Sequence, residues 1–384
     1  MCTVVRSFMP VGQGAFYVEQ FTSCNPRINL VFDCGSSTDE RILFQSINSV
    51  FQKGETIHAV FISHLHDDHI NGLEYLLSNY NVEKIYFPLL DCKAKTLTLL
   101  HYLASKNSHN TNDFFFRFVN EPYTYLISKD KRTEVIYVLP EDPEIIEYRQ
   151  RYGESVRSGE NVAKHINTMS RDYCKWEIVP FNFRNQQRII DLVKQLENIF
   201  SKYFPGENIQ IDEKFNLDDY WKRFPSIRSD IKNAYENIKG SLNTNSMVVF
   251  SGTTTNNAYQ HFCLSKTDDC YQCDSCCSTN YRSGCLYTGD YDCSGESKYN
   301  DLNSAYSNYW DNIGCITIPH HGSWHNYNPD LTSNRRVFCI ISASTKNNYQ
   351  HPHALVMRDL LRKRIITLWI NEEHKSKFQT YIYC

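Results

Sequence analysis

Short apolar and β-branched runs alternate with amphipathic stretches along most of the chain. The apolar runs predict strands at 2–8, 15–19, 29–32, 58–62, 83–87, 134–138, 247–250, 314–318 and 337–342. Apolar positions at helical spacing predict helices at 39–51, 72–77, 97–105, 188–204, 217–239 and 354–363. Strands that first follow one another and then alternate with helices favour a layered α/β fold.

Three segments depart from this pattern. Residues 91–131 and about 141–243 are rich in Tyr, Phe, Asn, Lys and Arg and carry weaker strand signals. We interpret both as helical insertions that decorate a core and are placed to cap an active site. The third segment, residues 263–293, is rich in cysteine. A chain of 384 residues can form one elaborated domain or two modest ones. Because no long linker divides it, we interpret residues 1–384 as a single domain.

Charge and hydropathy exclude some classes of protein. Forty Lys and Arg against 43 Asp and Glu give a net charge of -3, so there is no overall basic excess typical of a nucleic-acid surface. A local basic groove stays possible. No stretch reaches the roughly 18 uncharged apolar residues of a membrane span, and the N-terminus "MCTVVRSFMPVGQG" has no long apolar region. The sequence therefore predicts a soluble, cytoplasmic protein without a membrane partner.

The 15 cysteines divide into two groups. Eight are scattered through ordinary sequence, and we expect free thiols in a reducing compartment. The other seven lie in residues 263–293, which we call the Cys-rich segment, and include the run "CYQCDSCC". Its nested CxxC spacings are typical of a structural zinc knuckle, but no second CxxC stands at finger distance. The candidates for an additional structural zinc are Cys270, Cys273, Cys276 and Cys277, with Cys285 and Cys293 as further thiols. A thiol-rich loop, or local disulfides on oxidation, is the alternative.

The stretch "FISHLHDDHINGL" places three histidines and two aspartates in six positions directly after an apolar strand. A polar loop is the ordinary interpretation of such residues, but the spacing His-x-His-x-Asp-His is improbable by chance. Imidazole nitrogens and a carboxylate suit zinc, manganese or iron. Two ligand pairs so close together suit two ions. We expect His64 and His66 to bind one ion, and Asp68 and His69 to bind the other.

Later segments offer further ligands. Asp290 in "LYTGD" follows a short apolar run, and a carboxylate can bridge two ions because it has two oxygens. In "IPHHGS" a histidine pair ends an apolar strand. We favour His321 as the ligand and His320 as an orienting group, and leave the reverse assignment open.

The segment "NYQHPH" supplies His351 and His353, with Pro352 holding the chain extended just before a helix. One of these histidines would complete the second metal or act as a general acid. We favour His351. Asp68 is a candidate for managing the proton of the reaction, because it is a carboxylate inside the cluster.

The His-x-His-x-Asp-His motif after an apolar strand resembles the signature of the metallo-β-lactamase superfamily. The segments "PVGQGAFYVE", "VFDCGS", "NTNSMVVF", "LYTGDYD", "IPHHGSWHN" and "ISASTKNNYQHPH" follow in the order of one branch, which resembles the metallo-hydrolase domain of bacterial DNA-uptake channel proteins. The resemblance covers about 1–90 and 240–384. It implies a four-layered αββα sandwich and two divalent metal ions. It also implies that Asp33 orients a ligand from the second shell instead of binding metal.

One feature departs from the wider superfamily, because no "GHTPG"-like histidine precedes Asp290. The corresponding segment reads "NTNSMVVF", and the DNA-uptake branch also has an asparagine and a serine there. The third protein ligand of the first metal is therefore open. That branch often carries HxDxDH, whereas His66 here restores the fuller set of ligands.

The resulting functional hypothesis is a metal-dependent hydrolase. Two ions lower the pKa of a bound water to about 7 and hold an anionic substrate oxygen. We rank phosphodiester substrates first, from the branch resemblance, which makes the protein a phosphodiesterase or nuclease acting on nucleic acid or a nucleotide, with zinc or manganese. The alternatives are a hydrolase of lactones, β-lactams or thioesters, and a metal-binding effector or regulatory subunit that meets protein partners through the insertions.

Overall fold

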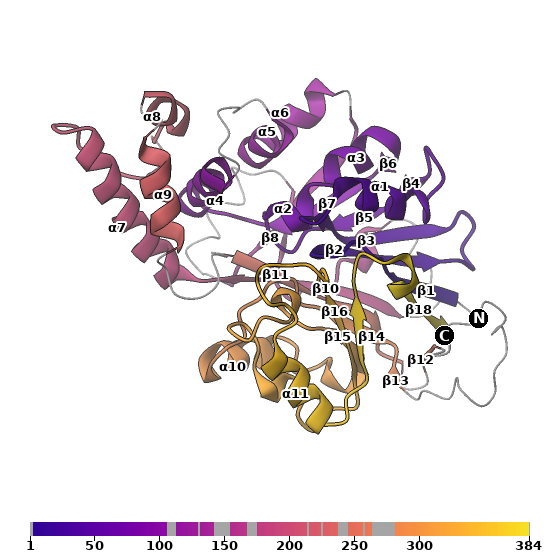
Figure 1. Cartoon of the computed structure of the whole chain (residues 1–384). Coiled ribbons are helices and arrows are strands. Elements are labelled where there is room, and N and C mark those ends of the chain that lie inside the picture. The colour runs from indigo at the N-terminus through magenta and orange to yellow at the C-terminus, as the bar shows by residue number, and fades with distance from the viewer. Residues whose placement is uncertain are drawn as a thin grey trace.

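The computed structural model describes residues 3–105, 113–129, 131–141, 154–166, 175–212, 215–223, 226–236, 245–255, 258–262 and 281–383. Within these residues, two large mixed sheets lie face to face, and helices cover the outer face of each (Figure 1). The predicted α/β class is confirmed, and each predicted strand corresponds to an observed one.

The first sheet has the strand order β13-β12-β18-β1-β2-β3-β5-β7-β8-β9. Strands β3, β5, β7, β8 and β9 pair in parallel, and the others in this sheet pair antiparallel. The bounds are β1 (Thr3–Phe8), β2 (Gly14–Phe21), β3 (Ile28–Ser36), β5 (Ala59–Phe61), β7 (Lys84–Pro88), β8 (Glu134–Leu139), β9 (Ser155–Arg157), β12 (Tyr259–His261), β13 (Tyr281–Arg282) and β18 (Phe378–Tyr383).

The second sheet has the order β10-β11-β14-β15-β16-β17. Its bounds are β10 (Trp176–Arg184), β11 (Asn245–Thr253), β14 (Gly284–Tyr287), β15 (Ile313–Thr317), β16 (Phe338–Ser342) and β17 (Thr367–Ile370). Strands β14 to β17 are parallel, so their carboxyl ends meet at one edge. Strand β11 is antiparallel to β14, which brings its beginning to the same edge. A small separate pair joins β4 (Thr56–Ile57) to β6 (Asn81–Val82).

The helices divide between the two outer faces. Those on the side of the first sheet are α1 (Glu40–Asn48), α2 (Asp67–Ile70), α3 (Leu73–Asn79), α4 (Cys92–Ser105), α5 (Phe114–Asn120), α6 (Pro122–Ser128), α7 (Gln186–Tyr203), α8 (Leu217–Arg223) and α9 (Ile227–Glu236). Those on the other side are α10 (Glu296–Ala305) and α11 (Ala354–Arg362). Single 3₁₀ turns are η2 (Ala163–His165), η3 (Trp310–Asn312), η4 (His320–Gly322), η5 (Pro329–Leu331) and η6 (His374–Ser376). Among the described helices, none has the length and apolar character that a bilayer crossing requires.

Three apolar clusters hold the layers together. One lies between the sheets, where Phe32 stacks on Tyr287 with ring centroids 3.9 Å apart. The second lies under the helices of the first sheet, and the third lies between the second sheet and helices α10 and α11. The order is therefore helices, sheet, sheet, helices, which is the predicted αββα sandwich. Burial of these apolar side chains is the main favourable contribution to folding.

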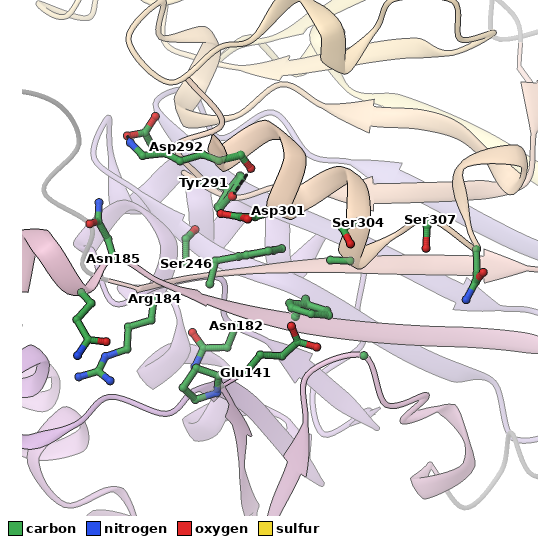
Figure 2. Close-up of a pocket in the computed structure, with 18 residues that line it drawn as sticks. Glu141, Asn182, Arg184, Asn185, Ser246, Tyr291, Asp292, Asp301, Ser304 and Ser307 are labelled. Atoms are coloured by element: carbon green, nitrogen blue, oxygen red, sulfur yellow. Dashed lines mark hydrogen bonds and ion pairs between the residues drawn. The ribbon is translucent and has the colours of Figure 1, made fainter. Parts of the chain in front are cut away.

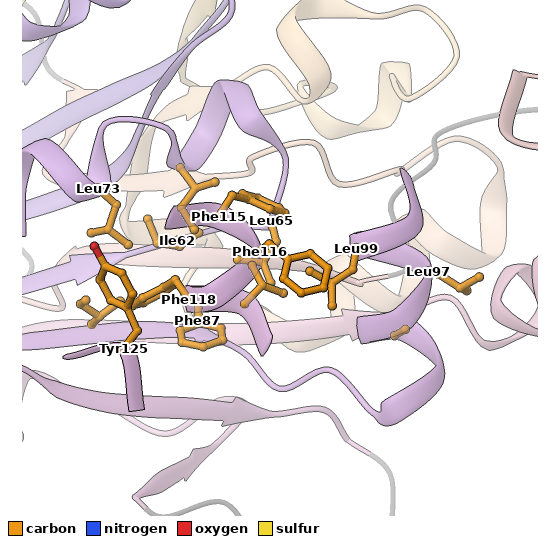
Figure 3. Close-up of a cluster of buried hydrophobic side chains, with 14 of the residues drawn as sticks. Ile62, Leu65, Leu73, Phe87, Leu97, Leu99, Phe115, Phe116, Phe118 and Tyr125 are labelled. Atoms are coloured by element: carbon orange, nitrogen blue, oxygen red, sulfur yellow. The ribbon is translucent and has the colours of Figure 1, made fainter. Parts of the chain in front are cut away.

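Residues 91–131 form helices in the described part of that segment, as the sequence predicts. Helices α4, α5 and α6 pack against the outer face of the first sheet (Figure 3). Phe118 of α5 is fully buried and lies beside Phe87 of β7, with ring centroids 6.0 Å apart. The first insertion therefore extends the apolar core directly.

Residues 141–243 were predicted as a helical insertion, and this is only partly right. Helices α7, α8 and α9 are present, but β9 and β10 belong to the two main sheets. Strand β10 reads "WEIVPFNFR" and holds Pro180. Proline weakens a strand pattern and is tolerated at a sheet edge, which is where β10 lies. The predicted helix 217–239 is two helices, α8 and α9.

The Cys-rich segment falls largely outside the described residues, and the candidate zinc ligands Cys270, Cys273, Cys276 and Cys277 all lie there. Its described end, 281–293, belongs to the main fold through β13 and β14. Cys285 and Cys293 are free, fully buried thiols. Because Cys285 points into the core between the sheets and Cys293 into the core beside α10, these two were wrongly grouped with the knuckle candidates.

Candidate metal centre

The sequence-predicted ligands come together at the edge where the parallel strands end. His64 and His66 follow β5, and Asp68 and His69 lie on the single-turn helix α2. The remaining residues follow three strands of the second sheet: Asp290 after β14, His320 and His321 in η4 after β15, and His351 in the loop after β16. The helix predicted at 72–77 is α3, and the additional short helix α2 begins at Asp67, within the cluster itself.

Asp290 lies at the middle of the cluster, and its two carboxylate oxygens face different histidine pairs. Oδ2 is 3.4 Å from His64 Nε2 and 3.5 Å from His320 Nε2. Oδ1 is 3.2 Å from His69 Nε2 and 3.7 Å from His321 Nε2. Two ligand atoms on one tetrahedral zinc lie about 3.4 Å apart, given metal–ligand bonds of about 2.1 Å. The separations around Asp290 therefore fit a carboxylate shared between two metal positions.

Asp68 is the second carboxylate of the cluster. Its Oδ2 is 3.1 Å from His321 Nε2. Three sets of ligand atoms lie within 4.8 Å of one another, and Asp68 belongs to two of them: His64, His69 and Asp290; His64, His66 and Asp68; Asp68, His69 and His321. The sets overlap, which indicates one compact group with room for neighbouring ions.

Three buried atoms of this group have no hydrogen-bond partner within the described structure: Nε2 of His64, Nε2 of His69 and Oδ1 of Asp290. All three residues are at most 2 % exposed. Burying polar atoms without a partner costs about 1–3 kcal/mol each. Imidazole nitrogens and a carboxylate oxygen are ligands of zinc and manganese, so a bound divalent ion would satisfy all three. The residues therefore fit the metals implied by the resemblance.

The outer nitrogens of four histidines are held by neighbours. Such hydrogen bonds from Nδ1 leave Nε2 facing the ligand side, as in known metal sites. The Nδ1 distances are 2.8 Å from His69 to Asp33 Oδ2, 2.8 Å from His321 to the Ser342 carbonyl, 3.0 Å from His64 to Ser63 Oγ, and 2.9 Å from His320 to Asn326 Oδ1. All four rings are therefore oriented before any ion binds.

Asp33, in the middle of the motif "VFDCG" on β3, lies behind this layer. Its carboxylate accepts hydrogen bonds from Ser63 N at 2.6 Å and Ser63 Oγ at 2.8 Å, in addition to the contact with His69. The carboxylate of Asp33 is thus turned to His69 Nδ1, away from the Nε2 atoms. This position suits the orienting role that the sequence predicts for it.

Backbone strain is concentrated at these residues. Asp33, His320 and His321 have positive φ angles of 54°, 50° and 55°. The left-handed region costs a non-glycine residue on the order of 1–3 kcal/mol, and such residues cluster at functional sites. The strain in η4 allows both His320 and His321 to face Asp290, which an extended dipeptide cannot do because successive side chains point to opposite faces.

Two glycines allow the close packing behind the ligands. A Cβ on Gly35 would lie 2.4 Å from the backbone of both Asp68 and His69. A Cβ on Gly289, whose φ is +51°, would lie 2.5 Å from the side chain of Ser63. Both contacts are too short for any side chain, so the motifs "VFDCG" and "LYTGD" require glycine at these positions.

The environment shifts the pKa values of the histidines in two directions. Burial lowers the pKa of His64 and His66 and keeps both imidazoles neutral. Burial also lowers the pKa of His69 and His321, but the surrounding carboxylates, Asp290 foremost, raise it by more, so the net pKa of each lies above its usual value. The protein therefore offers two neutral nitrogen ligands and two that exchange a proton for a metal ion.

His351 and His353 are separated by the structure. The His351 ring lies 5.4 Å from the His320 ring and 6.2 Å from the His321 ring, at the border of the cluster. His353 is the N-cap of α11, and its Nδ1 accepts a hydrogen bond from Leu355 N at 3.2 Å. Its ring lies against Trp324. The geometry favours His351 over His353 as a residue that acts at the centre.

Two residues beside the site were not predicted from the sequence. His101 of α4 has its ring centroid 5.2 Å from that of His66 and 5.0 Å from that of Tyr235 on α9. Gln13 Nε2 is 3.4 Å from His351 Nδ1. His101 lies inside a helical pattern of the first insertion, where a single histidine carries no signal. Gln13 lies in "VGQG", whose glycines are the more visible feature.

Comparison with known proteins supports the fold. Residues 15–157 match the model of the family described as the metallo-beta-lactamase superfamily. No curated protein matches the chain. Together with the family match, the layered architecture is consistent with the metallo-β-lactamase αββα sandwich.

Two solved structures are similar in outline only. Unliganded yeast PDE1 has 9% sequence identity and a TM-score of 0.43, with 100% of both chains covered. A long-form RNase Z from yeast has 9% identity and a TM-score of 0.34, covering 89% of this chain and 36% of the RNase Z chain. The family match over residues 15–157 contains the His64–His69 cluster, and the residues that face it follow strands of the second sheet.

Proposed function

We propose that this protein is a hydrolase that uses two divalent metal ions, zinc or manganese, to cleave phosphodiesters of nucleic acid or a nucleotide. The observation that carries the proposal is the position of Asp290. Its two oxygens face two separate histidine pairs, at distances that suit shared coordination. A cluster arranged for two adjacent ions supports hydrolysis more readily than structural binding, because structural zinc sites are typically single and closed.

We divide the ligands into two sets by the distances to Asp290 and Asp68, and we place His66 with His64 because both belong to one group of close ligand atoms. The first ion would be held by His64, His66, His320 and Asp290 Oδ2, and the second by Asp68, His69, His321 and Asp290 Oδ1. This assignment makes His320 the third histidine of the first ion, in place of the histidine missing from "NTNSMVVF". The sequence favoured His320 only as an orienting group.

The preference for phosphodiesters has two sources. One is the order of motifs shared with the DNA-uptake branch, and the other is the positive charge that two divalent ions would bring to an anionic substrate. Bound divalent ions would supply hydroxide at neutral pH and neutralise the attacked group and the leaving oxygen. The protein's own residues orient the histidines of the centre before any ion binds. Asp33 fixes the His69 ring, and Asp68 Oδ2 accepts a hydrogen bond from His321 Nε2 in the protonated state that the raised pKa of His321 favours.

His351 has a defined role in this proposal. The Gln13 amide donates to Nδ1 of His351, so in the neutral ring the proton is on Nε2. Burial and the neighbouring histidines lower the pKa of His351 to about 3, so the ring is neutral at pH 7. A neutral imidazole is a poor general acid, because it does not readily give up its N–H proton, but that N–H donates a hydrogen bond well. We assign His351 to hydrogen bonding a substrate oxygen from Nε2.

The test is hydrolysis of bis-p-nitrophenyl phosphate, single-stranded and duplex DNA, RNA and cyclic nucleotides by zinc- and manganese-loaded protein. Asp68→Ala should abolish turnover with the fold intact, because it removes a ligand and a hydrogen-bond acceptor from the centre. Asp67→Ala is the matched control, since Asp67 is on the same helix turn but belongs to none of the three ligand sets found among the described residues.

Three outcomes contradict the proposal. Turnover of none of these esters by the metal-loaded wild type rejects phosphodiester hydrolysis. Turnover of a lactone, β-lactam or thioester instead makes the alternative hydrolase the better assignment. Tight metal binding without turnover of any ester favours an effector or regulatory subunit.

A further inference from the structure

A cavity of about 740 Å³ opens along strand β10, between β10 and helix α10 (Figure 2). Its walls come from the ends of β10 and β11, the segment after Asp290 and one side of α10. A volume of this size lies within the range of small-molecule sites. None of the candidate metal ligands lines the cavity, so it is a separate site.

The cavity is joined to the metal centre by two short connections. Tyr291, which lines it, directly follows the shared ligand Asp290. Ser246, also in the lining, precedes Met247, whose backbone N–H donates to the Ser63 carbonyl at 2.7 Å. Ser63 is the residue before His64. Tyr291 is therefore bonded directly to a candidate ligand, and Met247 and Ser63 lie between Ser246 and His64.

One wall of the cavity is aromatic. Phe181 and Phe183 stack with ring centroids 4.9 Å apart, and Phe183 lies 4.5 Å from Tyr291. Phe181 and Tyr291 are buried, whereas Phe183 is half-buried and presents part of its ring to the cavity. An aromatic face of this kind suits a planar ligand, since a ring can stack on it.

Ser246 gives a second, independent indication of a ligand. Its residue is 5% exposed, and its Oγ has no hydrogen-bond partner within the described structure. In Figure 2 the hydroxyl points toward the side on which Tyr291 and Asp301 lie. A buried hydroxyl is normally satisfied, so an unpaired one on a cavity wall is a free position for a ligand hydrogen bond.

The charges of the lining decide which chemistry fits. Arg184 is ion-paired with Asp91, and Lys298 with Asp292. Glu141 and Asp301 add two exposed carboxylates. The lining of the cavity therefore has more carboxylates than cations, and it would repel a phosphate group of a ligand. A neutral planar ring with hydrogen-bond donors fits the aromatic wall, the hydroxyl and the carboxylates.

We propose that this cavity binds a nucleobase of the substrate whose phosphate lies at the metal centre. The inference rests on the proposed function and adds to it, because it makes the substrate a nucleotide ester instead of a generic diester. Stacking on Phe183 and a hydrogen bond to Ser246 Oγ hold the base, while the carboxylates on the rim accept from its N–H groups.

The test compares two esters that release the same product, the p-nitrophenyl ester of thymidine 5′-monophosphate and bis-p-nitrophenyl phosphate. Phe183→Ala should lower the ratio of kcat/KM for the thymidine ester to kcat/KM for the bis-ester by about tenfold, the scale of one lost stacking contact. Ser246→Ala should lower the same ratio by a few fold. Tyr381→Ala, an exposed aromatic on β18, is the matched control and should leave the ratio unchanged.

Direct binding separates failure of this proposal from failure of the proposed function. Thymidine and adenosine binding to the metal-loaded protein is measured by equilibrium dialysis, with ribose as the comparison. One outcome is that neither ester is hydrolysed, but nucleosides bind and Phe183→Ala weakens their binding. In that case the cavity assignment holds and the hydrolase assignment fails. If the bis-ester is hydrolysed but the ratio is unchanged in Phe183→Ala, or ribose binds as well as the nucleosides, the nucleobase proposal is overturned.

Discussion

The metal centre consists of two halves that are built in different ways. The N-terminal half, His64 to His69, is one continuous six-residue stretch that runs from the end of β5 into helix α2. The C-terminal half takes Asp290, His320 and His321 from two different loops of the second sheet. A local loop holds its ligands by its own backbone. Distant loops hold theirs only because parallel strands end at one edge, so the second half depends on the whole fold.

The two halves also differ in how they are stabilised. In the N-terminal half, Asp68 and His69 lie on helix α2, and none of the four ligands has a positive φ angle. In the C-terminal half, His320 and His321 both have positive φ angles. Strain persists only where surrounding structure compensates for it. Asp290 faces histidines of both halves through both of its oxygens, so we expect its replacement to have the largest effect.

Asp290→Ala should remove both ions, not one. In the proposed arrangement the carboxylate would supply an oxygen to each metal position, and its loss also leaves His69 and His321 without their main negative neighbour. Elemental analysis should fall from near two ions per chain to near zero, and kcat/KM for the bis-ester should fall by at least about 10³-fold, corresponding to several kcal/mol. His64→Ala serves as the comparison. If Asp290→Ala keeps one full ion, the carboxylate is not shared.

Asp33→Asn should have an intermediate effect, confined to the N-terminal half. The amide loses the charge that holds His69 and one of its acceptor oxygens, while its volume is unchanged. Loss of an orienting partner typically lowers metal affinity 10–100-fold. Metal titration should show one of two binding steps weakened by this factor. Equal weakening of both steps would mean that Asp33 supports the centre as a whole.

The pH dependence follows from the raised pKa values of His69 and His321. A metal must displace the protons that these two histidines hold in the metal-free protein, and it binds only their neutral forms. Metal affinity should therefore fall as the pH decreases through their raised pKa values, beginning above 6.5 and approaching about tenfold per pH unit for each proton displaced.

Thermal unfolding with and without metal measures this effect. In the metal-free protein, the raised pKa values of the two histidines contribute stability that is fully present below pH 6.5 and lost as the pH rises. Metal-induced stabilisation has the opposite dependence. The increase in Tm on adding zinc should widen from pH 6 to pH 8. A constant difference over this range would show that no ligand loses a proton on binding.

His353→Ala should have the smallest effect. Its Nδ1 caps helix α11, so replacing it should cost about 1 kcal/mol of unfolding free energy while kcat/KM stays within about twofold of wild type. Urea unfolding and bis-ester kinetics measure the two quantities. His351→Ala is the matched comparison, because it should affect kinetics more than stability. A larger kinetic effect for His353→Ala than for His351→Ala would mean that His353, and not His351, acts on the substrate.

The sequence by itself determined much of the framework. Apolar runs located the strands that carry the site, and the His64–His69 spacing predicted two neighbouring ligand pairs without any tertiary information. Such features are local: the backbone periods of strands and helices and the identities of adjacent residues fix them. Strand β10 was missed because Pro180 weakens its pattern, and its place at a sheet edge is a property of the fold.

Only the tertiary structure decided how the two halves meet. Sequence reasoning favoured His321 over His320, because one side chain of an adjacent pair was expected to face the site, whereas the left-handed backbone turns both to Asp290. His101 and the cavity beside Tyr291 were likewise invisible, since their neighbours are distant in sequence. Contacts between strand ends are set by sheet order and register, and a linear pattern of residues does not contain that information.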